Sequence, residues 1–402
     1  MAVGHIKGTG SARAIYIRAR LRRVFRILDR EVPCEEVCFD PNDEKELDEA
    51  IEIFERLNKG GMNLKQADVK AARLASEATA SVLPRMREFM KKTDVQSLGL
   101  NFLFLTRVLA TLQRGDSSFI SDKKKRGERT FWSPCDREDG RPVNANWTAS
   151  EKALNEVVRI VRDELGWTTR RWLTSANALI PIAYLIKWKP NRLTQNDKES
   201  IRNYLGIGGV RKLFHGSVET TINHYVRAVK NVRDEGKPLR GEVLLHAVPK
   251  RERTPITPDE ILSETRMTAP LMQIYLSYLV SQDAYTWLSG TLLRTVAKSA
   301  ADSIAVHHIF PKHYLEDCGI SAKFVNSMAN YALISQRDNE SIGDEDPKAV
   351  FGRMDAEQRE RAECQLFVIA NYELLAAKAF EEYRQMRAKK LADQLNQFLG
   401  LR

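Results

Sequence analysis

The stretch Ile304-Ala305-Val306-His307-His308-Ile309-Phe310-Pro311-Lys312-His313 decides how this chain is interpreted, because three of its seven histidines fall within seven residues there. The apolar and β-branched residues before the histidine pair predict a short strand. Pro311 prevents a helix from continuing through the segment. Adjacent strand residues point to opposite faces, but the backbone can turn at a strand end. His307 and His308 are therefore predicted to lie where a strand enters a loop, with different functions.

A returning strand is predicted at 329–335, Ala-Asn-Tyr-Ala-Leu-Ile-Ser, and a helix is predicted to begin near Asp338. Taken in order, the chain gives strand, loop, strand and helix. Twenty-one residues separate His308 from Asn330, and eight separate Asn330 from Asn339. The histidine pair alone would be interpreted as hydrogen-bonded residues of a hairpin. Together with the two asparagines, it predicts a site with a chemical function.

This order and spacing resemble the HNH nuclease motif, in which a ββα-metal hairpin holds one divalent cation between the hairpin and the helix. The resemblance implies that His308 is the general base and that Asn330 orients it by hydrogen bonding. It also implies that His307 and Asn339 are metal ligands. Many HNH enzymes have Asp at the first ligand position and His at the last, and neutral ligands bind hard Mg²⁺ less strongly than carboxylates do. We expect Mg²⁺, with Mn²⁺ or Zn²⁺ as alternatives.

These residue types suit the hydrolysis of a phosphodiester. The reaction needs a deprotonated water in line with the leaving oxygen, and a neutral imidazole is a natural general base near neutral pH. A metal ion stabilises the charge that builds on the phosphoryl oxygens and on the departing oxygen. Asp302, Asp338 and His313 are additional candidate ligands, which the spacing neither includes nor excludes.

Two further segments extend the resemblance to most of the chain. Residues 53–64, Ile-Phe-Glu-Arg-Leu-Asn-Lys-Gly-Gly-Met-Asn-Leu, are similar to a stretch of GmrSD-type restriction proteins. So are residues 283–290, Asp-Ala-Tyr-Thr-Trp-Leu-Ser-Gly, followed by the histidine run and by 325–330, Val-Asn-Ser-Met-Ala-Asn. In that family an N-terminal DGQQR-containing domain of ParB-like fold precedes helices and a C-terminal HNH-type nuclease. No Asp-Gly-Gln-Gln-Arg sequence occurs here. We therefore expect either a fragment or a shortened form without nucleotide hydrolysis.

Helical periodicity dominates the rest of the sequence. We expect a mostly α protein with a small ββα-metal (HNH) nuclease module in its C-terminal third and a partial ParB-like N-terminal region. The expected parts are a remnant of the N-terminal domain at 1–80, a helical middle domain at 81–240, and a nuclease domain with flanking helices at 255–402. The segment 234–258 collects glycines, prolines and charges, which is typical of a linker.

Three shorter patterns give local expectations. Residues 148–151, Thr-Ala-Ser-Glu, are typical of a capping box that opens a helix. Residues 206–209, Gly-Ile-Gly-Gly, are interpreted as a bend between helices. Residues 123–126, Lys-Lys-Lys-Arg, form a basic loop, which is more often a solvated surface than a phosphate contact.

Composition limits the class of partner. The 63 Lys and Arg exceed the 53 Asp and Glu, so the formal charge is +10 and the pI is near 9.3, which favours a polyanion such as DNA. The apolar run 178–186 is interrupted by Pro181 and is far shorter than the roughly 20 residues of a transmembrane helix. We therefore expect no membrane span. Five scattered cysteines and the lack of an apolar signal after Met1 favour reduced thiols in the cytoplasm.

We therefore expect a cytoplasmic, metal-dependent HNH-type DNA endonuclease. Family analogy implies a restriction or anti-phage defence protein that acts on foreign or modified DNA. The alternative is a catalytically silent DNA-binding or scaffolding protein that keeps the hairpin as a structural site, a type usually closed by four thiolate or imidazole ligands. Cleavage of both strands would need two passes or a homodimer. A separate N-terminal regulatory chain is the other expected partner.

Overall fold

The computed structural model describes Leu21, Ile53 and the stretches 82–117, 143–189, 191–299, 301–321, 324–368 and 370–401. The expected ParB-like remnant at 1–80, apart from Leu21 and Ile53, lies outside the described residues, and so does the basic loop 123–126. From Val82 onward, every described element belongs to one compact unit, 64–402.

The described part of the chain is mostly helical, as the periodicity predicted. None of its helices is long and apolar enough to cross a bilayer. The first group of α-helices is α4 (Val82–Lys91), α5 (Thr93–Ser97), α6 (Phe102–Arg114), α7 (Val143–Arg159), α8 (Leu179–Trp188), α9 (Gln195–Val210), α10 (Val218–Asp234) and α11 (Glu242–Ala247). Short helical turns connect them: η3 (Ile160–Glu164), η4 (Arg170–Trp172), η5 (Ala176–Ala178) and η6 (Lys250–Glu252).

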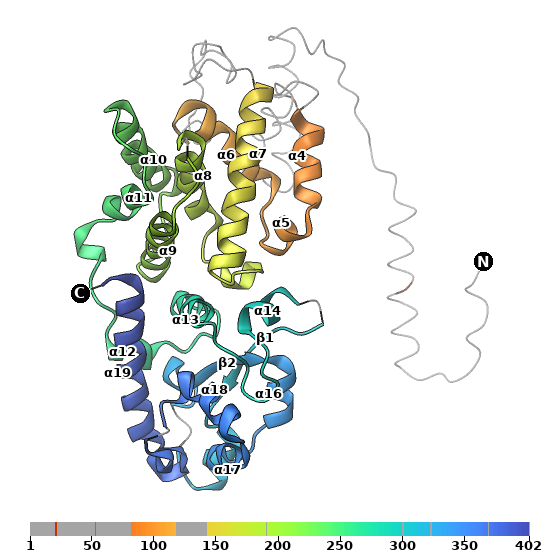
Figure 1. Ribbon diagram of the computed structural model, residues 1–402, viewed down its shortest axis with the longest axis vertical. Coiled ribbons are helices and arrows are strands. Elements are labelled where there is room, and N and C mark those ends of the chain that lie inside the picture. Colours follow the sequence, from red (N-terminus) through yellow and green to blue (C-terminus); the bar gives the residue numbers. More distant parts are fainter. Residues whose placement is uncertain are drawn as a thin grey trace, which may run out of the picture. The chain divides into compact units, whose positions relative to one another are not determined.

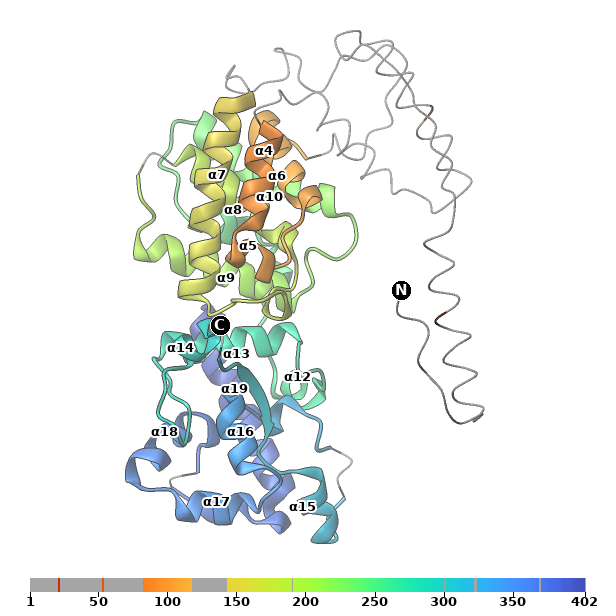
Figure 2. The same cartoon turned by 90° about the vertical axis from the view of Figure 1, so that its right-hand side faces the viewer.

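The second group contains the sheet. Its elements are α12 (Pro258–Ser263), α13 (Pro270–Ser281), α14 (Leu293–Lys298), β1 (Ile304–His308), α15 (Lys312–Asp317), η7 (Met328–Asn330), β2 (Tyr331–Ser335), α16 (Gln336–Ile342), α17 (Pro347–Arg353), α18 (Ala356–Leu366), η8 (Tyr372–Leu375), η9 (Ala377–Ala379) and α19 (Phe380–Leu399). The helices α4 to α11 lie on one side of α13 (Figure 1). The turned view shows α15 to α18 on the other side of α13 (Figure 2).

The expected capping box at 148–151 is wrong. Helix α7 begins at Val143, so this segment lies inside the helix. Its polar side chains have tertiary partners instead, because Arg85 of α4 donates to Thr148 Oγ1 and to Glu151 Oε2, each at 3.1 Å. The polar residues of 148–151 contact α4, but their order is the same as that of a capping box at the start of a helix.

The expected bend at 206–209 is also wrong, because these glycines lie within α9. A Cβ atom on Gly206 would lie 2.6 Å from Leu399 Cδ2 and 2.9 Å from Ile274 Cδ1. The missing side chain therefore lets α13 and α19 pack closely against α9. Here glycine provides close approach, not a turn.

The segment expected to be a linker contains α11 and is packed. Its apolar residues Leu239, Leu244, Val248 and Ile256 are buried. They belong to a hydrophobic core cluster whose members run from Val82 to Leu401. The prolines and glycines of this segment shape a folded connection, so composition alone did not distinguish it from a solvated linker.

Strands β1 and β2 pair antiparallel, with Ile304 opposite Ser335 and His308 opposite Tyr331. Strand β2 is buried along its whole length, and its alternate residues face different surroundings. Tyr331 and Leu333 join the large core cluster, whereas Ala332 and Ile334 join a second cluster. The hairpin is thus packed on both faces, which fixes the end of β1 where the histidine pair lies.

Candidate functional site

The start of α16 is fixed by one capping interaction and by one contact with a distant segment. The Ser335 side chain accepts a hydrogen bond of 3.0 Å from the backbone N–H of Asp338. The buried Asp338 carboxylate in turn accepts hydrogen bonds from the N–H groups of Leu288, at 2.7 Å, and Ser289, at 3.2 Å. Asp338 therefore holds the segment after Trp287 against α16. Its carboxylate is committed to that contact.

His307 and Asn339, the two residues expected to be metal ligands, are brought together. His307 Nδ1 donates to Asn339 Oδ1 across 3.0 Å, from β1 to α16. The His307 side chain is 5 % exposed, and the ring of Trp287 meets it edge to face at 5.6 Å between centroids. The hairpin, the helix and the segment held by Asp338 thus enclose this imidazole.

Burial lowers the pKa of His307 to about 4. The hydrogen bond to Asn339 and the charge of Asp344 raise this pKa, and the charge of His308 lowers it, but desolvation is the largest effect. His307 is therefore neutral near pH 7. The neutral imidazole is the form that can bind a metal ion.

The donor atoms fit a divalent cation bound in an open site. Adjacent ligand atoms of an octahedral ion lie about 3.0 Å apart when each is about 2.1 Å from the ion. The observed separation between His307 Nδ1 and Asn339 Oδ1 is also 3.0 Å, and an ion bound by both atoms would take the place of the shared hydrogen. In the described stretches, no three His, Cys, Asp or Glu side chains gather into a metal-binding group. The remaining ligands would come from water and substrate, as they do at many Mg²⁺ sites.

The other candidate ligands lie elsewhere. His313 lies on α15 and is exposed. The Asp302 carboxylate accepts a hydrogen bond of 2.8 Å from the next backbone N–H, that of Ser303. Asp344, in the turn after α16, is the acid whose charge acts on His307.

His308 faces the opposite side of the hairpin. His307 is opposite Ala332 of the second core cluster, and His308 is opposite Tyr331, whose ring it meets edge to face at 5.1 Å. His308 Nε2 donates to Asn326 Oδ1 across 3.0 Å. This hydrogen bond selects the tautomer in which Nδ1 carries the lone pair. The expected base is therefore oriented by Asn326 in the loop before η7, and it is partly exposed.

Asn330 does not make the direct hydrogen bond to His308 that we expected. It is fully buried, and its Oδ1 accepts from Phe310 N at 2.9 Å. Its Nδ2 donates to the carbonyls of Phe310 and Val325, each at 2.9 Å. Asn330 thus pins the two ends of the loop that carries Asn326, so it can act on His308 only through the backbone.

A buried arginine also binds the backbone around Asn330. Arg387 of α19 is fully buried, and its guanidinium donates to the carbonyls of Met328, Ala329 and Tyr331 at 3.0, 2.9 and 2.7 Å. It also donates to Gln365 O at 2.8 Å. These carbonyls flank Asn330, so α19 fixes the backbone on both sides of that residue.

Sequence reasoning gave no role to Asn326, Trp287, Asp344 or Arg387. Asp344 lies in a loop, where no periodicity marks which side chain turns toward a site. Asn326 also lies in a loop, but within the stretch 325–330 that carries part of the family resemblance. Trp287 lies in the segment 283–290 that carries the family resemblance, so that segment was the available signal. Arg387 looks like an ordinary charged residue of an amphipathic helix until its 0 % exposure is known.

The chain matches no protein-family model, and no curated protein matches it in sequence.

Proposed function

We propose that this chain is a metal-dependent HNH-type DNA endonuclease. The single observation that carries the proposal is the hydrogen bond of 3.0 Å between His307 at the end of β1 and Asn339 on α16, with His308 next in sequence on the other face. The hairpin and α16 thus bring together the neutral pair His307 and Asn339. They place the partly exposed imidazole of His308 separately from that pair. The resemblance in sequence spacing supports the same assignment.

Within this proposal, His307 and Asn339 hold a divalent cation, with Mg²⁺, Mn²⁺ or Zn²⁺ as candidates. The bound ion would supply stabilisation of negative charge on the phosphoryl oxygens. His308 takes the proton of the attacking water on Nδ1, while Asn326 holds Nε2. Asn330 and Arg387 are positioning residues, because they fix the loop backbone and do not contact the reacting atoms.

A structural zinc site in a silent DNA-binding or scaffolding protein is the competing function. Such sites are usually closed by four thiolate or imidazole ligands. Near His307 the described part of the chain offers one imidazole and one amide oxygen at this distance. An open site suits that donor set better than a closed one.

DNA is the proposed substrate because the chain carries a formal charge of +10. A role in restriction or anti-phage defence, in the cytoplasm and against foreign or modified DNA, follows only from the family analogy. A homodimer would couple the cuts in the two DNA strands. A regulatory N-terminal chain would control them.

The test is nicking of supercoiled plasmid, plain and base-modified, by the purified chain with Mg²⁺ or Mn²⁺. We expect His308→Ala to lower the rate by at least about a hundredfold, the effect typical of a general base. His313→Ala is the matched control, since His313 is five residues away, exposed and outside the site, and it should nick like the wild type. Equal nicking by His308→Ala and wild type, or no nicking of either DNA by the folded wild type with either metal, would overturn the proposal.

A further inference from the structure

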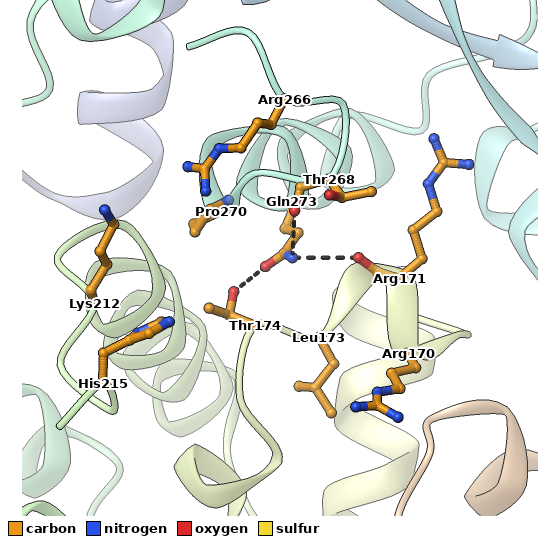
Figure 3. A pocket seen from close by; sticks show the side chains of 10 residues that line it. All are labelled: Arg170, Arg171, Leu173, Thr174, Lys212, His215, Arg266, Thr268, Pro270 and Gln273. Carbon is orange, nitrogen blue, oxygen red and sulfur yellow. Dashed lines mark hydrogen bonds between the residues drawn. The ribbon is translucent and has the colours of Figure 1, made fainter. Parts of the chain in front are cut away.

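A second site lies away from the histidine pair, in a pocket between the end of α9, η4 and the start of α13. Its volume is about 510 Å³, within the range of roughly 300–1,000 Å³ that is usual for ligand sites. Lys212 and His215 line it from one side, Arg170 and Arg171 from another, and Arg266 lies before α13 (Figure 3). No acidic side chain lines it.

The positive charge of this pocket is largely uncompensated. Arg266 is paired with Glu264, at 2.9 and 3.0 Å. Within the described stretches, Arg170, Arg171 and Lys212 make no ion pair. Surrounding protein lowers the pKa of the Arg171 guanidinium by desolvation, although the residue as a whole is exposed. An anion bound beside that guanidinium would offset this cost.

A second pocket, of about 620 Å³, shows that this lack of pairing is not general. There Arg159 pairs with Glu156 at 2.6 Å, and Lys198 pairs with Glu164 at 2.6 Å. Lys189 lies 3.3 Å from Asp197. Three of the four cations that line the larger pocket, Arg159, Lys189 and Lys198, have carboxylate partners within the protein, and Arg192 is the exception among its described lining residues. Around Lys212 and Arg171 the proportion is reversed, because of the described cations there only Arg266 is paired.

Lys212 also occupies a backbone position that favours glycine. Its φ is 54°, and it lies at the end of α9, where its N–H donates to Gly209 O and the N–H of Leu213 donates to Gly208 O. This is the Schellman arrangement, whose left-handed residue is usually glycine. A lysine here carries a conformational cost that glycine would not. An anion bound beside the ammonium group would offset this cost.

The pocket offers cationic groups and no surface on which a base could stack. Its lining has no Phe, Tyr or Trp, so no aromatic surface is offered for stacking. Gln273, the buried amide at its floor, is already bonded to Thr174, Arg171 O and Thr268 O (Figure 3). The cationic side chains, with the side chains of His215 and Thr268, remain to bind a ligand.

We propose that this pocket binds phosphate groups. The same oxyanion chemistry is carried by the DNA backbone and by small phosphate compounds, and the charge of the chain favours the backbone. Only that choice of source rests on the proposed nuclease function. Bound there, a backbone phosphate would position DNA on the protein without reading its sequence.

The test compares two double variants of the full chain that lose the same charge. Lys212→Gly with Arg171→Gln removes two pocket cations, and Lys212→Gly relieves the left-handed lysine, so its melting temperature should not fall for that reason. Lys152→Gln with Arg192→Gln is the control, because both residues are exposed and lie outside this pocket. Binding of a short labelled DNA duplex is measured by fluorescence anisotropy with EDTA present, so that cleavage plays no part.

We expect the pocket variant to bind DNA about tenfold more weakly and to lower the slope of log affinity against log salt by about 2, with the control changing affinity less than about twofold. In a second arm, tripolyphosphate is added during thermal unfolding. If DNA binding is unchanged but tripolyphosphate stabilises the wild type and the control and not the pocket variant, the ligand is a small phosphate compound. If both double variants behave alike in both arms, the proposal is overturned.

Discussion

His307 and His308 are neighbours in the sequence, yet the hairpin gives them different surroundings. His307 is enclosed by Trp287 and α16, which keeps it neutral, whereas His308 is partly exposed and bonded to Asn326. A histidine that binds a metal ion must be neutral, whereas a general base must exchange protons with water. Because successive side chains of a strand point to opposite faces, the proposed metal ligand and the proposed base can be neighbours in sequence and still lie in different surroundings.

The buried His307 should make folding stability depend on pH. Its pKa is about 4 in the native state and near 6.5 when unfolded, so between these values the unfolded chain binds the proton and the native chain does not. The contribution is fully present above pH 6.5 and is lost as the pH falls toward 4. The difference corresponds to about 3 kcal/mol. Urea unfolding in EDTA at several pH values should show it.

The matched variant for this measurement is His307→Gln, which keeps a polar side chain but does not titrate. The free energy of unfolding of the wild type should fall more steeply than that of His307→Gln between pH 6.5 and 4. Parallel curves for the two proteins would show that His307 does not titrate differently in the folded state.

Asn330 shows what sequence spacing can and cannot predict about a residue. Its position relative to His308 and Asn339 predicted its importance, and the structure gives it three side-chain hydrogen bonds in a fully buried place. Its partners were not predictable, because they are backbone groups of residues 310 and 325 that only the folded loop brings together. The bond expected from Asn330 is made by Asn326 instead.

At the scale of elements, local patterns predicted β1 and β2 and failed where tertiary packing decided the outcome. The β-branched residues and Pro311 are local signals, and the strands follow them; α16 begins at Gln336, two residues before the expected start near Asp338. The glycines of α9 carry the same local signal as a bend, but their role depends on α13 and α19, which are distant in sequence.

Two glycines of α9 should respond oppositely to alanine. On Gly206 a methyl group would meet the buried side chains of Leu399 and Ile274 at 2.6 and 2.9 Å, so Gly206→Ala should lower the free energy of unfolding by about 1–3 kcal/mol. On Gly208 the nearest atom, Phe214 Cε2, is 3.8 Å away. Gly208→Ala should therefore stabilise the protein by about 0.5–1 kcal/mol, because alanine is the better helix former.

Chemical denaturation of both variants, with the wild type as reference, checks this pair. Because the substitution is the same and the sites are two residues apart in one helix, helix propensity cancels in the comparison. A Gly206→Ala protein as stable as Gly208→Ala would mean that α9, α13 and α19 are not packed as closely as described.

At the scale of the whole molecule, the candidate site is held by the C-terminal helix. Arg387 of α19 donates to backbone carbonyls on η7 and β2, and the Tyr275 hydroxyl of α13 accepts a further hydrogen bond from it at 3.3 Å. The guanidinium is buried and, among the described residues, has no carboxylate partner. Four backbone carbonyls and the Tyr275 hydroxyl satisfy it, so the helix and the hairpin depend on each other.

Removing this guanidinium should be costly. Arg387→Met leaves several buried carbonyls without their donor, and we expect the free energy of unfolding to fall by at least about 3 kcal/mol. Lys389→Met, on the exposed side of the same helix, should change it by less than about 0.5 kcal/mol. Thermal and urea unfolding of the two variants measure the difference. Similar stabilities would show that α19 does not support the hairpin through Arg387.

The sequence predicted the helical class, the hairpin and the pairing of His307 with Asn339, all of which have local or spaced signals. It did not predict that one core cluster has members from both ends of the described stretches, Val82 and Leu401. Nor did it predict the basic pocket around Lys212 and Arg171. The pocket combines α9, η4 and the residues before α13, which are separated by tens of residues. The sequence of each segment alone contains no pattern that predicts that α9, η4 and the residues before α13 lie around one pocket.

The central claim is that His308 is the base of a metal-dependent nuclease site, and chemical rescue tests it most directly. His308→Gly is assayed for nicking of supercoiled plasmid with Mn²⁺, without and with free imidazole, beside His313→Gly. We predict that His308→Gly loses at least about a hundredfold in rate, that imidazole restores part of it, and that His313→Gly is unaffected in both conditions. Nicking by His308→Gly at the wild-type rate without imidazole would contradict the claim.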